Sequence, residues 1–122
     1  MYQVTFSNQA IGEINKMDKL RQIEIIDRLG SITPAELEAG KGDIGSFHRF
    51  GRNYYRLRAG DYRIYFELLP ESQTIRAHYV LHQHTIADFV FRFKLPFSEE
   101  TMVEQEDNFW KYLDSLKNGK DK

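Results

Sequence analysis

Hydrophobic and polar residues alternate with a period of two over two neighbouring stretches in the middle of the chain, residues 54–59 and 62–67. Alternation of this kind is typical of a β-strand, because successive side chains of a strand point to opposite faces of the sheet. Gly60 and Asp61 separate the two stretches, and a Gly-Asp pair between two such runs predicts a β-hairpin. We therefore expect an antiparallel pair of strands at the centre of the fold.

The two faces of this predicted hairpin differ in chemistry. Leu57, Ile64 and Phe66 are expected to face the core. The opposite face then carries the basic side chains and one tyrosine, namely Arg56, Arg58, Arg63 and Tyr65. A cationic, aromatic-lined sheet face suits a phosphate backbone and stacked bases. Arginines are also common on the solvent face of antiparallel hairpins without such a role, so the pattern alone leaves both interpretations open.

Apolar residues recur at helical spacing in the N-terminal part of the chain, over residues 8–17 and 19–29. Ser7 and Asp18 precede the two stretches and predict N-caps, and Gly30 predicts the end of the second helix. Thr33 followed by Pro34 predicts the start of a third, short helix. The two longer helices are expected to form an antiparallel helical hairpin.

The rest of the pattern completes an α+β fold. Further elements are expected along the chain: strands at 2–6, 47–50 and 74–81, a glycine-rich connector at 38–46, a short helix at 85–93 and a last helix at 98–116. A helical hairpin followed by a run of antiparallel strands favours helices packed on one face of a sheet. We expect a twisted, mostly antiparallel sheet of four or five strands, with the N-terminal strand and the helical hairpin packed on it and an extra C-terminal helix.

Composition limits the class of protein. The 122 residues fit one domain, and 41% hydrophobic with 29% charged residues is typical of a globular chain rather than a disordered one. No apolar run approaches the roughly 20 residues that span a bilayer, and the chain starts with strand-like residues rather than a signal peptide. Cysteine is absent, which excludes disulfides and Cys-ligated zinc. We expect a cytoplasmic protein without a membrane partner.

Positive charge is concentrated in one segment. The formal net charge of −1 does not by itself indicate a nucleic-acid-binding protein. Residues 49–63, however, hold five arginines and a single acid, Asp61. Because the local field matters more than the total charge, Arg49 and Arg52 join the hairpin arginines as candidate RNA-binding residues.

The residues that carry a family resemblance lie at 55–66, Tyr-Arg-Leu-Arg-Ala-Gly-Asp-Tyr-Arg-Ile-Tyr-Phe. With a short strand and a helical hairpin before this motif, and a strand ending near His-Gln-His after it, the chain resembles the RelE/ParE superfamily. These proteins are toxins of bacterial type II toxin–antitoxin systems. The resemblance implies a toxin domain at residues 1–93, with residues 94–122 as a C-terminal helical extension of the same domain.

The two branches of this superfamily imply different activities. The RelE branch implies a metal-independent, cofactor-free ribonuclease that cuts messenger RNA in the ribosomal decoding site and so represses translation. The ParE branch implies an inhibitor of DNA gyrase that cuts nothing. Both imply a cognate antitoxin protein as partner. A catalytically retired toxin that keeps the fold and binds a partner is a third interpretation.

Metal-free RNA cleavage needs a base for the 2′-hydroxyl proton, an acid for the leaving 5′-oxygen and a cation for the phosphorane. By the resemblance, Arg63 occupies the phosphate-contacting position. Arg56 and Arg58 match basic positions on the preceding strand. Arginine suits this task because its planar fork can hold two phosphate oxygens at once.

The end of the last predicted strand departs from the family pattern. Gln83 or Thr85 stands where arginine is usual, and Phe89 stands where tyrosine is usual. His82 and His84 are therefore the candidate catalytic acid and base, because an unperturbed imidazole titrates near a pKa of about 6.5. The alternative is that the nuclease machinery is degraded, which favours the gyrase or the retired-toxin interpretation.

The histidines near the strand at 74–81 and the last helix can each be interpreted as functional or as ordinary structural features. In the strand at 74–81, alternation assigns Ala77 to one face and His78 with Val80 to the other. His78 would then share a face with His82 and His84, but histidines at alternating exposed positions explain this without a metal, and no metal site is predicted. The last helix can cover the arginine face of its own chain or form the contact of a homodimer.

Overall fold

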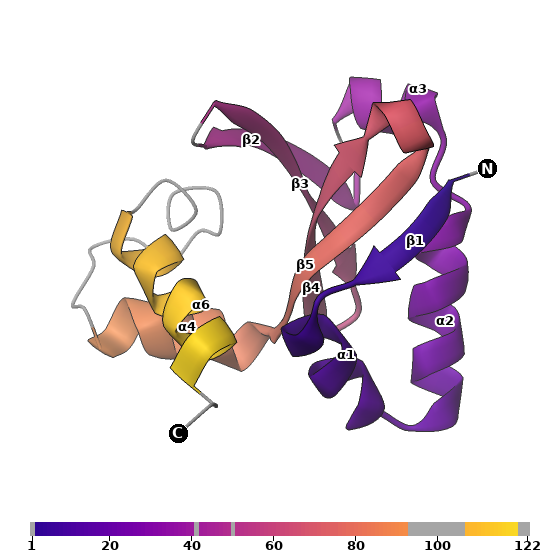
Figure 1. The fold of residues 1–122 in the computed structure, drawn as a ribbon. Coiled ribbons are helices and arrows are strands. Elements are labelled where there is room, and N and C mark those ends of the chain that lie inside the picture. Colours follow the sequence, from indigo (N-terminus) through magenta and orange to yellow (C-terminus); the bar gives the residue numbers. More distant parts are fainter. Residues whose placement is uncertain (1, 41, 50, 93–106, 120–122) are drawn as a thin grey trace. The chain divides into compact units, whose positions relative to one another are not determined.

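The structure is a computed structural model that describes residues 2–40, 42–49, 51–92 and 107–119 (Figure 1). The chain divides into two compact units, Met1–Val80 and Leu81–Lys122. The sheet has five strands: β1 (Gln3–Phe6), β2 (Ile44–Arg49), β3 (Arg52–Ala59), β4 (Tyr62–Leu69) and β5 (Thr74–His82). The last strand along the chain, β5, crosses the boundary between the two units. The first unit also contains α1 (Asn8–Asn15), α2 (Lys19–Gly30), α3 (Pro34–Ala39) and a 3-10 turn, η1 (Pro70–Ser72). The predicted α+β class is confirmed.

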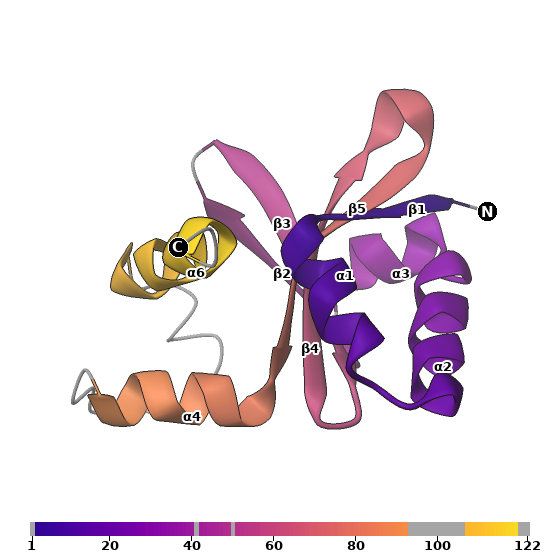
Figure 2. The same cartoon turned by 60° about the horizontal axis from the view of Figure 1, so that its bottom comes forward.

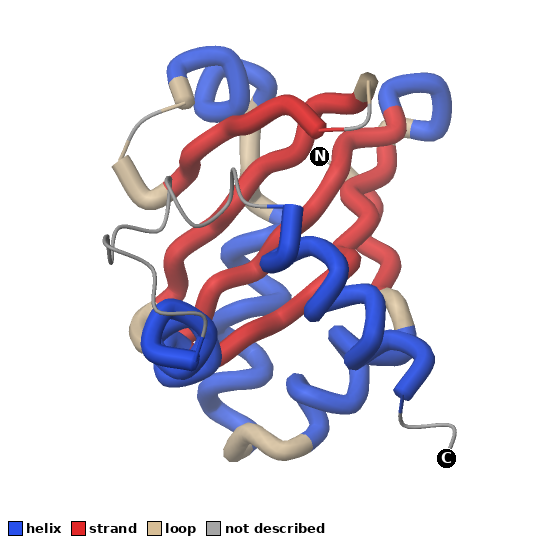
Figure 3. Tube along the Cα trace, turned by 90° about the vertical axis from the view of Figure 1, so that its left-hand side faces the viewer, coloured by secondary structure: helices blue, strands red, loops and turns tan. Residues whose placement is uncertain are grey.

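The strands lie side by side in the order β1-β5-β4-β3-β2 (Figure 3). β2, β3 and β4 form an antiparallel meander, in which Leu57 pairs with Ile44 on one side and with Ile64 on the other. β1 lies parallel to β5, with Gln3 opposite Thr74. The predicted central hairpin is thus confirmed. The sheet is mostly antiparallel, and its β1–β5 edge is a parallel pair.

The core lies between the sheet and the helical hairpin of α1 and α2, which cover the same face of the sheet (Figures 1 and 2). Leu57, Ile64 and Phe66 are fully buried there, as their alternation predicts. Ile25 and Leu29 of α2 are buried in the same cluster. Burial of each such side chain contributes about 1.5–3 kcal/mol, so this layer provides most of the stability of the unit.

Side-chain caps fix where the helices begin. The Ser7 hydroxyl accepts a hydrogen bond from the Ala10 amide, and Asp18 accepts one from the Arg21 amide. Thr33 and Glu36 form a reciprocal capping box at the start of α3, with Pro34 at the first helical position. Each such cap stabilises its helix by about 1 kcal/mol, and all three were expected at these residues.

One boundary and one face differ from the sequence expectation. β2 begins at Ile44, inside the predicted connector, because Ile44 is buried and pairs with Leu57. Along β5 the core-facing residues are Ile75 and Ala77 and then Val80, so the alternation shifts by one residue and Val80 lies on the core side rather than with His78. An extra residue of this kind is typical of a β-bulge.

Gln9 holds β5 where this shift occurs. Its side-chain amide donates to the carbonyl of Val80 at 3.0 Å and accepts from the Val80 amide at 2.9 Å. The Ser7 amide donates to the carbonyl of Ala77, and the Ser7 hydroxyl donates to the carbonyl of His78. Because both Gln9 and Val80 are buried, this amide continues the β1–β5 ladder beyond the last residue of β1.

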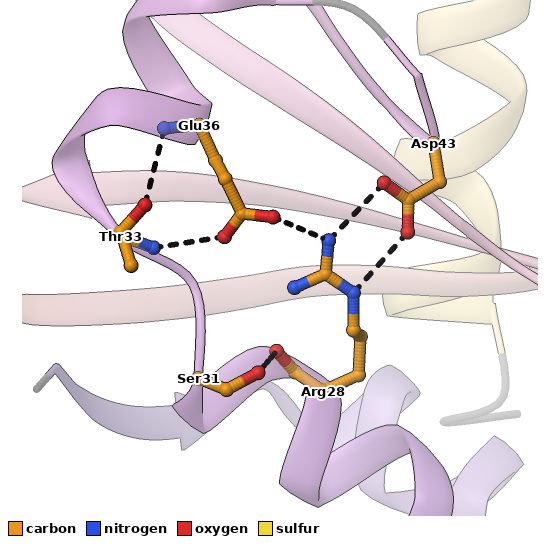
Figure 4. Close-up of polar contacts among 5 residues, drawn as sticks. All are labelled: Arg28, Ser31, Thr33, Glu36 and Asp43. Atoms are coloured by element: carbon orange, nitrogen blue, oxygen red, sulfur yellow. Dashed lines mark hydrogen bonds and ion pairs between the residues drawn. The ribbon is translucent and has the colours of Figure 1, made fainter.

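An ion-pair network ties α2 to α3 and to the residue before β2 (Figure 4). Arg28 binds Asp43 with two nitrogens, Nε at 3.2 Å and Nη2 at 3.1 Å, and Nη2 also donates to Glu36 at 2.9 Å. The other oxygen of Glu36 accepts from the Thr33 amide at 3.0 Å. The hydrogen bond from Arg28, and then that from Thr33, lowers the pKa of Glu36 below its ordinary value.

We expect Arg28→Ala to lower the free energy of unfolding by about 1–2 kcal/mol at neutral pH, since charge-assisted bonds are lost at a partly exposed site. A carboxyl with a lowered folded-state pKa stabilises the fold above its unfolded pKa and loses that contribution as pH falls through the folded value. The difference in the free energy of unfolding between wild type and Arg28→Ala should therefore shrink as the pH falls through the folded-state pKa of Glu36, which lies below the ordinary range of a glutamate. Urea unfolding at several pH values measures it, and a difference that does not change with pH would contradict the network.

The second unit contains α4 (Gln83–Arg92) and α6 (Asp107–Gly119). α4 begins two residues before the predicted Thr85, and the predicted start of the last helix at Ser98 lies outside the described residues. Phe109 and Trp110 of α6 are buried and meet edge to face, with ring centroids 5.6 Å apart. Among the described residues, no helix is both long and apolar enough to cross a membrane.

Candidate functional site

The candidate site is the sheet face opposite α1 and α2, called the outer face below. The register of β2, β3 and β4, together with the contacts of β5, assigns nine side chains to it: Phe47, Arg52, Tyr54, Arg56, Arg58, Arg63, Tyr65, Glu67 and His78. Four of them are arginines, so this face carries the concentrated positive charge that the sequence indicates.

Arg58 and Arg63 lie directly opposite each other across the β3–β4 hairpin. Arg58 is exposed and Arg63 is half-buried. Nη1 of Arg63 donates to the carbonyls of Gly60 and Tyr62, both at 3.0 Å, which holds the side chain beside the turn. Like charges directly opposite each other in a sheet repel.

Arg56 and Tyr65 correct the sequence expectation. They are paired across β3 and β4 on the outer face, but Arg56 is only 4% exposed and Tyr65 is fully buried. The expectation of an exposed surface is therefore contradicted at these two residues, whereas a role of either in RNA binding stays a prediction. Alternation gives the face on which a strand residue lies, but it does not tell whether that face is open to solvent.

Gly45 makes room for the buried Arg56. The two residues are paired in register, and a Cβ atom at Gly45 would lie 2.3 Å from Nη2 and 2.9 Å from Cζ of Arg56. The guanidinium group therefore lies over the β2 backbone at the one position without a side chain.

We expect Gly45→Ala to displace the Arg56 side chain and to lower the free energy of unfolding by about 1–3 kcal/mol. Gly12→Ala is the matched control, because nothing lies within 4 Å of a Cβ at this position of α1 and alanine favours a helix. Thermal unfolding of both variants measures the difference. If Gly45→Ala is as stable as wild type, Arg56 is not held over Gly45.

Among the candidate RNA-binding arginines whose hydrogen-bond or ion-pair partners the structure describes, Arg52 has the most exposed side chain. Its side chain is 60% exposed, and Nη1 lies 3.5 Å from Oε1 of Glu67. A hydrogen bond with Tyr54, and then the charge of Glu67, raises the pKa of Arg52 above its ordinary value, so it stays a cation. Arg49 pairs with Arg52 in register, and its side chain lies outside the described residues.

His82 and His84 lie at the start of α4, in the second unit. Their rings stack, with centroids 4.8 Å apart and planes 16° apart, and Nδ1 of His82 accepts a hydrogen bond from the His84 amide. His82 is thus placed to cap α4 when Nδ1 is unprotonated. Gln83 is exposed, Thr85 is half-buried, and the side chain of Phe89 lies outside the described residues.

The structure also brings together a pair that the sequence analysis did not single out. Nε2 of His78 lies 3.1 Å from Oε1 of Glu67, and the ring of Tyr54 meets the His78 ring edge to face at 5.9 Å. The alternation of β4 and β5 places both residues on non-core positions, but only the register between the strands makes them neighbours. Within the described part of the chain, no group of three or more His, Cys, Asp or Glu side chains is placed to hold a metal ion.

Solved structures of toxin–antitoxin proteins share this fold. A chain of the archaeal RelE–RelB complex from Pyrococcus horikoshii OT3 matches with a TM-score of 0.54 and 18% sequence identity, over 66% of this chain and 93% of that chain. The protein has the RelE fold. A chain of the toxin–antitoxin complex RelBE2 from Mycobacterium tuberculosis matches with a TM-score of 0.50 and 22% identity, over 66% of this chain and 96% of that chain.

No protein-family model and no curated protein matches the sequence. The RelE fold therefore rests on the shape of the chain and on the order of its elements. Because both matches span nearly all of the compared chains but two thirds of this one, about a third of this chain has no counterpart in them.

Proposed function

We propose that this protein is the toxin of a type II toxin–antitoxin system, with a cognate antitoxin as its partner. Two observations support the proposal. The fold is that of RelE, and the two similar chains come from a RelE–RelB complex and a RelBE2 toxin–antitoxin complex. On this proposal residues 1–93 are the toxin domain and residues 94–122 are its helical extension.

The proposed activity is metal-independent cleavage of messenger RNA. The observation that carries it is the opposition of Arg58 and Arg63 across the hairpin, with the exposed Arg52 on the same face. Arginines at these positions can hold phosphate oxygens and neutralise the charge that develops on a pentavalent phosphorus. Arg63 is the proposed phosphate-binding catalytic residue, and His82 and His84 remain candidates for proton transfer.

Expression in a bacterial host tests this proposal. We would induce the wild-type chain, the double variant Arg58→Gln/Arg63→Gln, and the control Lys16→Ala, which removes one positive charge from the exposed C-terminal end of α1. Growth and transcript integrity are followed together, with soluble protein measured in each culture. We expect growth arrest with cleaved transcripts for wild type and Lys16→Ala, and neither effect for the double variant.

The other outcomes separate the alternatives. Growth arrest with intact transcripts would overturn the ribonuclease and point to a target such as gyrase. Absence of any growth effect from soluble wild-type protein would overturn the toxin proposal and leave a retired, partner-binding member of the fold.

A further inference from the structure

An arginine of α2 lies against the turn that joins β3 to β4, at the end of the first unit where α2 begins (Figures 1 and 2). A Cβ atom at Gly60 would lie 2.5 Å from Nη1 and 3.3 Å from Cζ of Arg21. The carbonyl of the same glycine accepts the hydrogen bond from Nη1 of Arg63, at 3.0 Å. Two guanidinium groups from different elements therefore lie beside one turn residue.

Gly60 suits this place for two reasons. Its φ of +61° lies in the left-handed region, which glycine adopts without strain. The missing side chain also leaves the space that the Arg21 guanidinium group occupies. Gly60 is exposed, and the Arg21 side chain is 37% exposed, so this guanidinium group lies at the surface of the unit rather than in its core.

The ion pair of Arg21 is a weak one. Nη1 lies 3.8 Å from Oε1 of Glu24, which is one turn further along α2, and the Glu24 side chain is 57% exposed. Exposed pairs of this kind contribute roughly 0–1 kcal/mol. A phosphate oxygen can therefore replace Glu24 as the partner of Arg21 at little cost in free energy, and an arginine–phosphate bond is among the stronger hydrogen bonds.

Arg21 continues the row of arginines that begins on the outer face. Arg58 and Arg63 lie opposite each other just before and after the turn, on the face away from α2. Arg21 reaches the same turn from the helical side, so the three arginines follow the end of the hairpin from one face of the sheet to the other. The charged residues of the turn and of the start of α2 are four cations and three acids: Lys19, Arg21, Arg58, Arg63, Asp18, Glu24 and Asp61. This end keeps an excess of positive charge, and a row of cations can track the backbone of a single strand.

We propose that Arg21 is a further RNA-binding residue, which holds a phosphate of the strand next to the phosphate bound at Arg58 and Arg63. The RNA then passes around the end of the β3–β4 hairpin onto the start of α2. This inference rests on the proposed function, in which Arg63 binds the phosphate at the reacting centre. Arg21 lies outside the sequence motif, and only the contact between α2 and the turn brings it to this surface.

The test is binding of the purified full chain to a labelled single-stranded RNA of about ten nucleotides, a length within the usual site sizes of such surfaces. Fluorescence anisotropy is measured at several salt concentrations. We expect Arg21→Gln to weaken binding about 3–10-fold at low salt and to reduce the magnitude of the salt slope by about 0.7, the value of one phosphate contact. Lys19→Gln is the matched control, because it removes one positive charge from an exposed position in the same turn of α2, and side chains two positions apart do not share a helix face.

Arg21→Lys separates a phosphate contact from a structural role. Lysine keeps the charge but lacks the planar group that lies against Gly60. We expect this variant to keep the wild-type salt slope, with an affinity between those of wild type and Arg21→Gln. If Arg21→Lys loses as much affinity as Arg21→Gln, and both melt at a lower temperature than wild type, Arg21 supports the turn and the inference is wrong.

The remaining outcomes separate this inference from the proposed function. If Arg58→Gln/Arg63→Gln weakens RNA binding while Arg21→Gln binds like wild type, the inference fails and the phosphate-binding role of Arg63 stands. If Lys19→Gln reduces the slope as much as Arg21→Gln, the effect comes from total charge, and Arg21 makes no contact of its own. If wild type does not bind the RNA, the role proposed for Arg63 fails and that of Arg21 fails with it.

Discussion

Gln9→Ala is expected to lower the free energy of unfolding by about 2–4 kcal/mol. The substitution leaves the amide and the carbonyl of Val80 without the side-chain partner that each has now, in a place where Val80 is fully buried. Buried backbone groups without partners keep their full desolvation cost, and the space of the missing amide adds a cavity. Few single changes outside the apolar core should cost as much.

Urea unfolding followed by circular dichroism measures this loss. Gln3→Ala is the control, because it removes the same kind of side chain from an exposed position of β1. We expect the control to lie within about 0.5 kcal/mol of wild type. A Gln9→Ala protein as stable as Gln3→Ala would show that β5 satisfies Val80 in another way.

Arg58→Gln combined with Arg63→Gln is expected to weaken binding to single-stranded RNA by about 10–100-fold at low salt. Each phosphate contact contributes about 0.7 to the slope of the logarithm of affinity against the logarithm of salt concentration. Loss of two contacts should therefore reduce the magnitude of that slope by roughly 1.4. Fluorescence anisotropy with a labelled oligonucleotide at several salt concentrations measures both quantities.

Lys16→Ala, which removes a single positive charge at the end of α1, serves again as the control and should leave the slope unchanged. Equal slopes for wild type and the double variant would mean that Arg58 and Arg63 do not contact phosphates. Since Arg63 also bonds the carbonyls of Gly60 and Tyr62, a melting curve of the double variant is needed to show that the hairpin turn persists.

Local chemistry accounts for what the sequence predicted well. Ser7, Asp18 and Thr33 cap the helices at which they were expected, because a cap depends on residues within one turn of the chain. The hairpin around Gly60 was equally predictable, since its register is set by a short turn and by the burial of Leu57, Ile64 and Phe66.

The features that could not be predicted from the sequence depend on packing between residues far apart in the chain. The burial of Arg56 and Tyr65 depends on what covers a sheet face, which alternation does not report. The shift at Val80 depends on an amide 71 residues earlier in the chain. The Glu67–His78 pair follows from the register between two strands, and neither residue belongs to the motif that carried the family resemblance.

The parallel pairing of β1 with β5 has a consequence for folding during synthesis on the ribosome. β2, β3 and β4 pair with near neighbours in the chain, whereas Gln3 must find Thr74, which is 71 residues away. Contacts of such separation are slow to form because the loop must close first. We therefore expect the meander to fold before β1 pairs with β5 at the edge of the sheet. A nascent chain that has not yet released β5 should be unable to complete the outer face, so any activity located there would arise only late in synthesis.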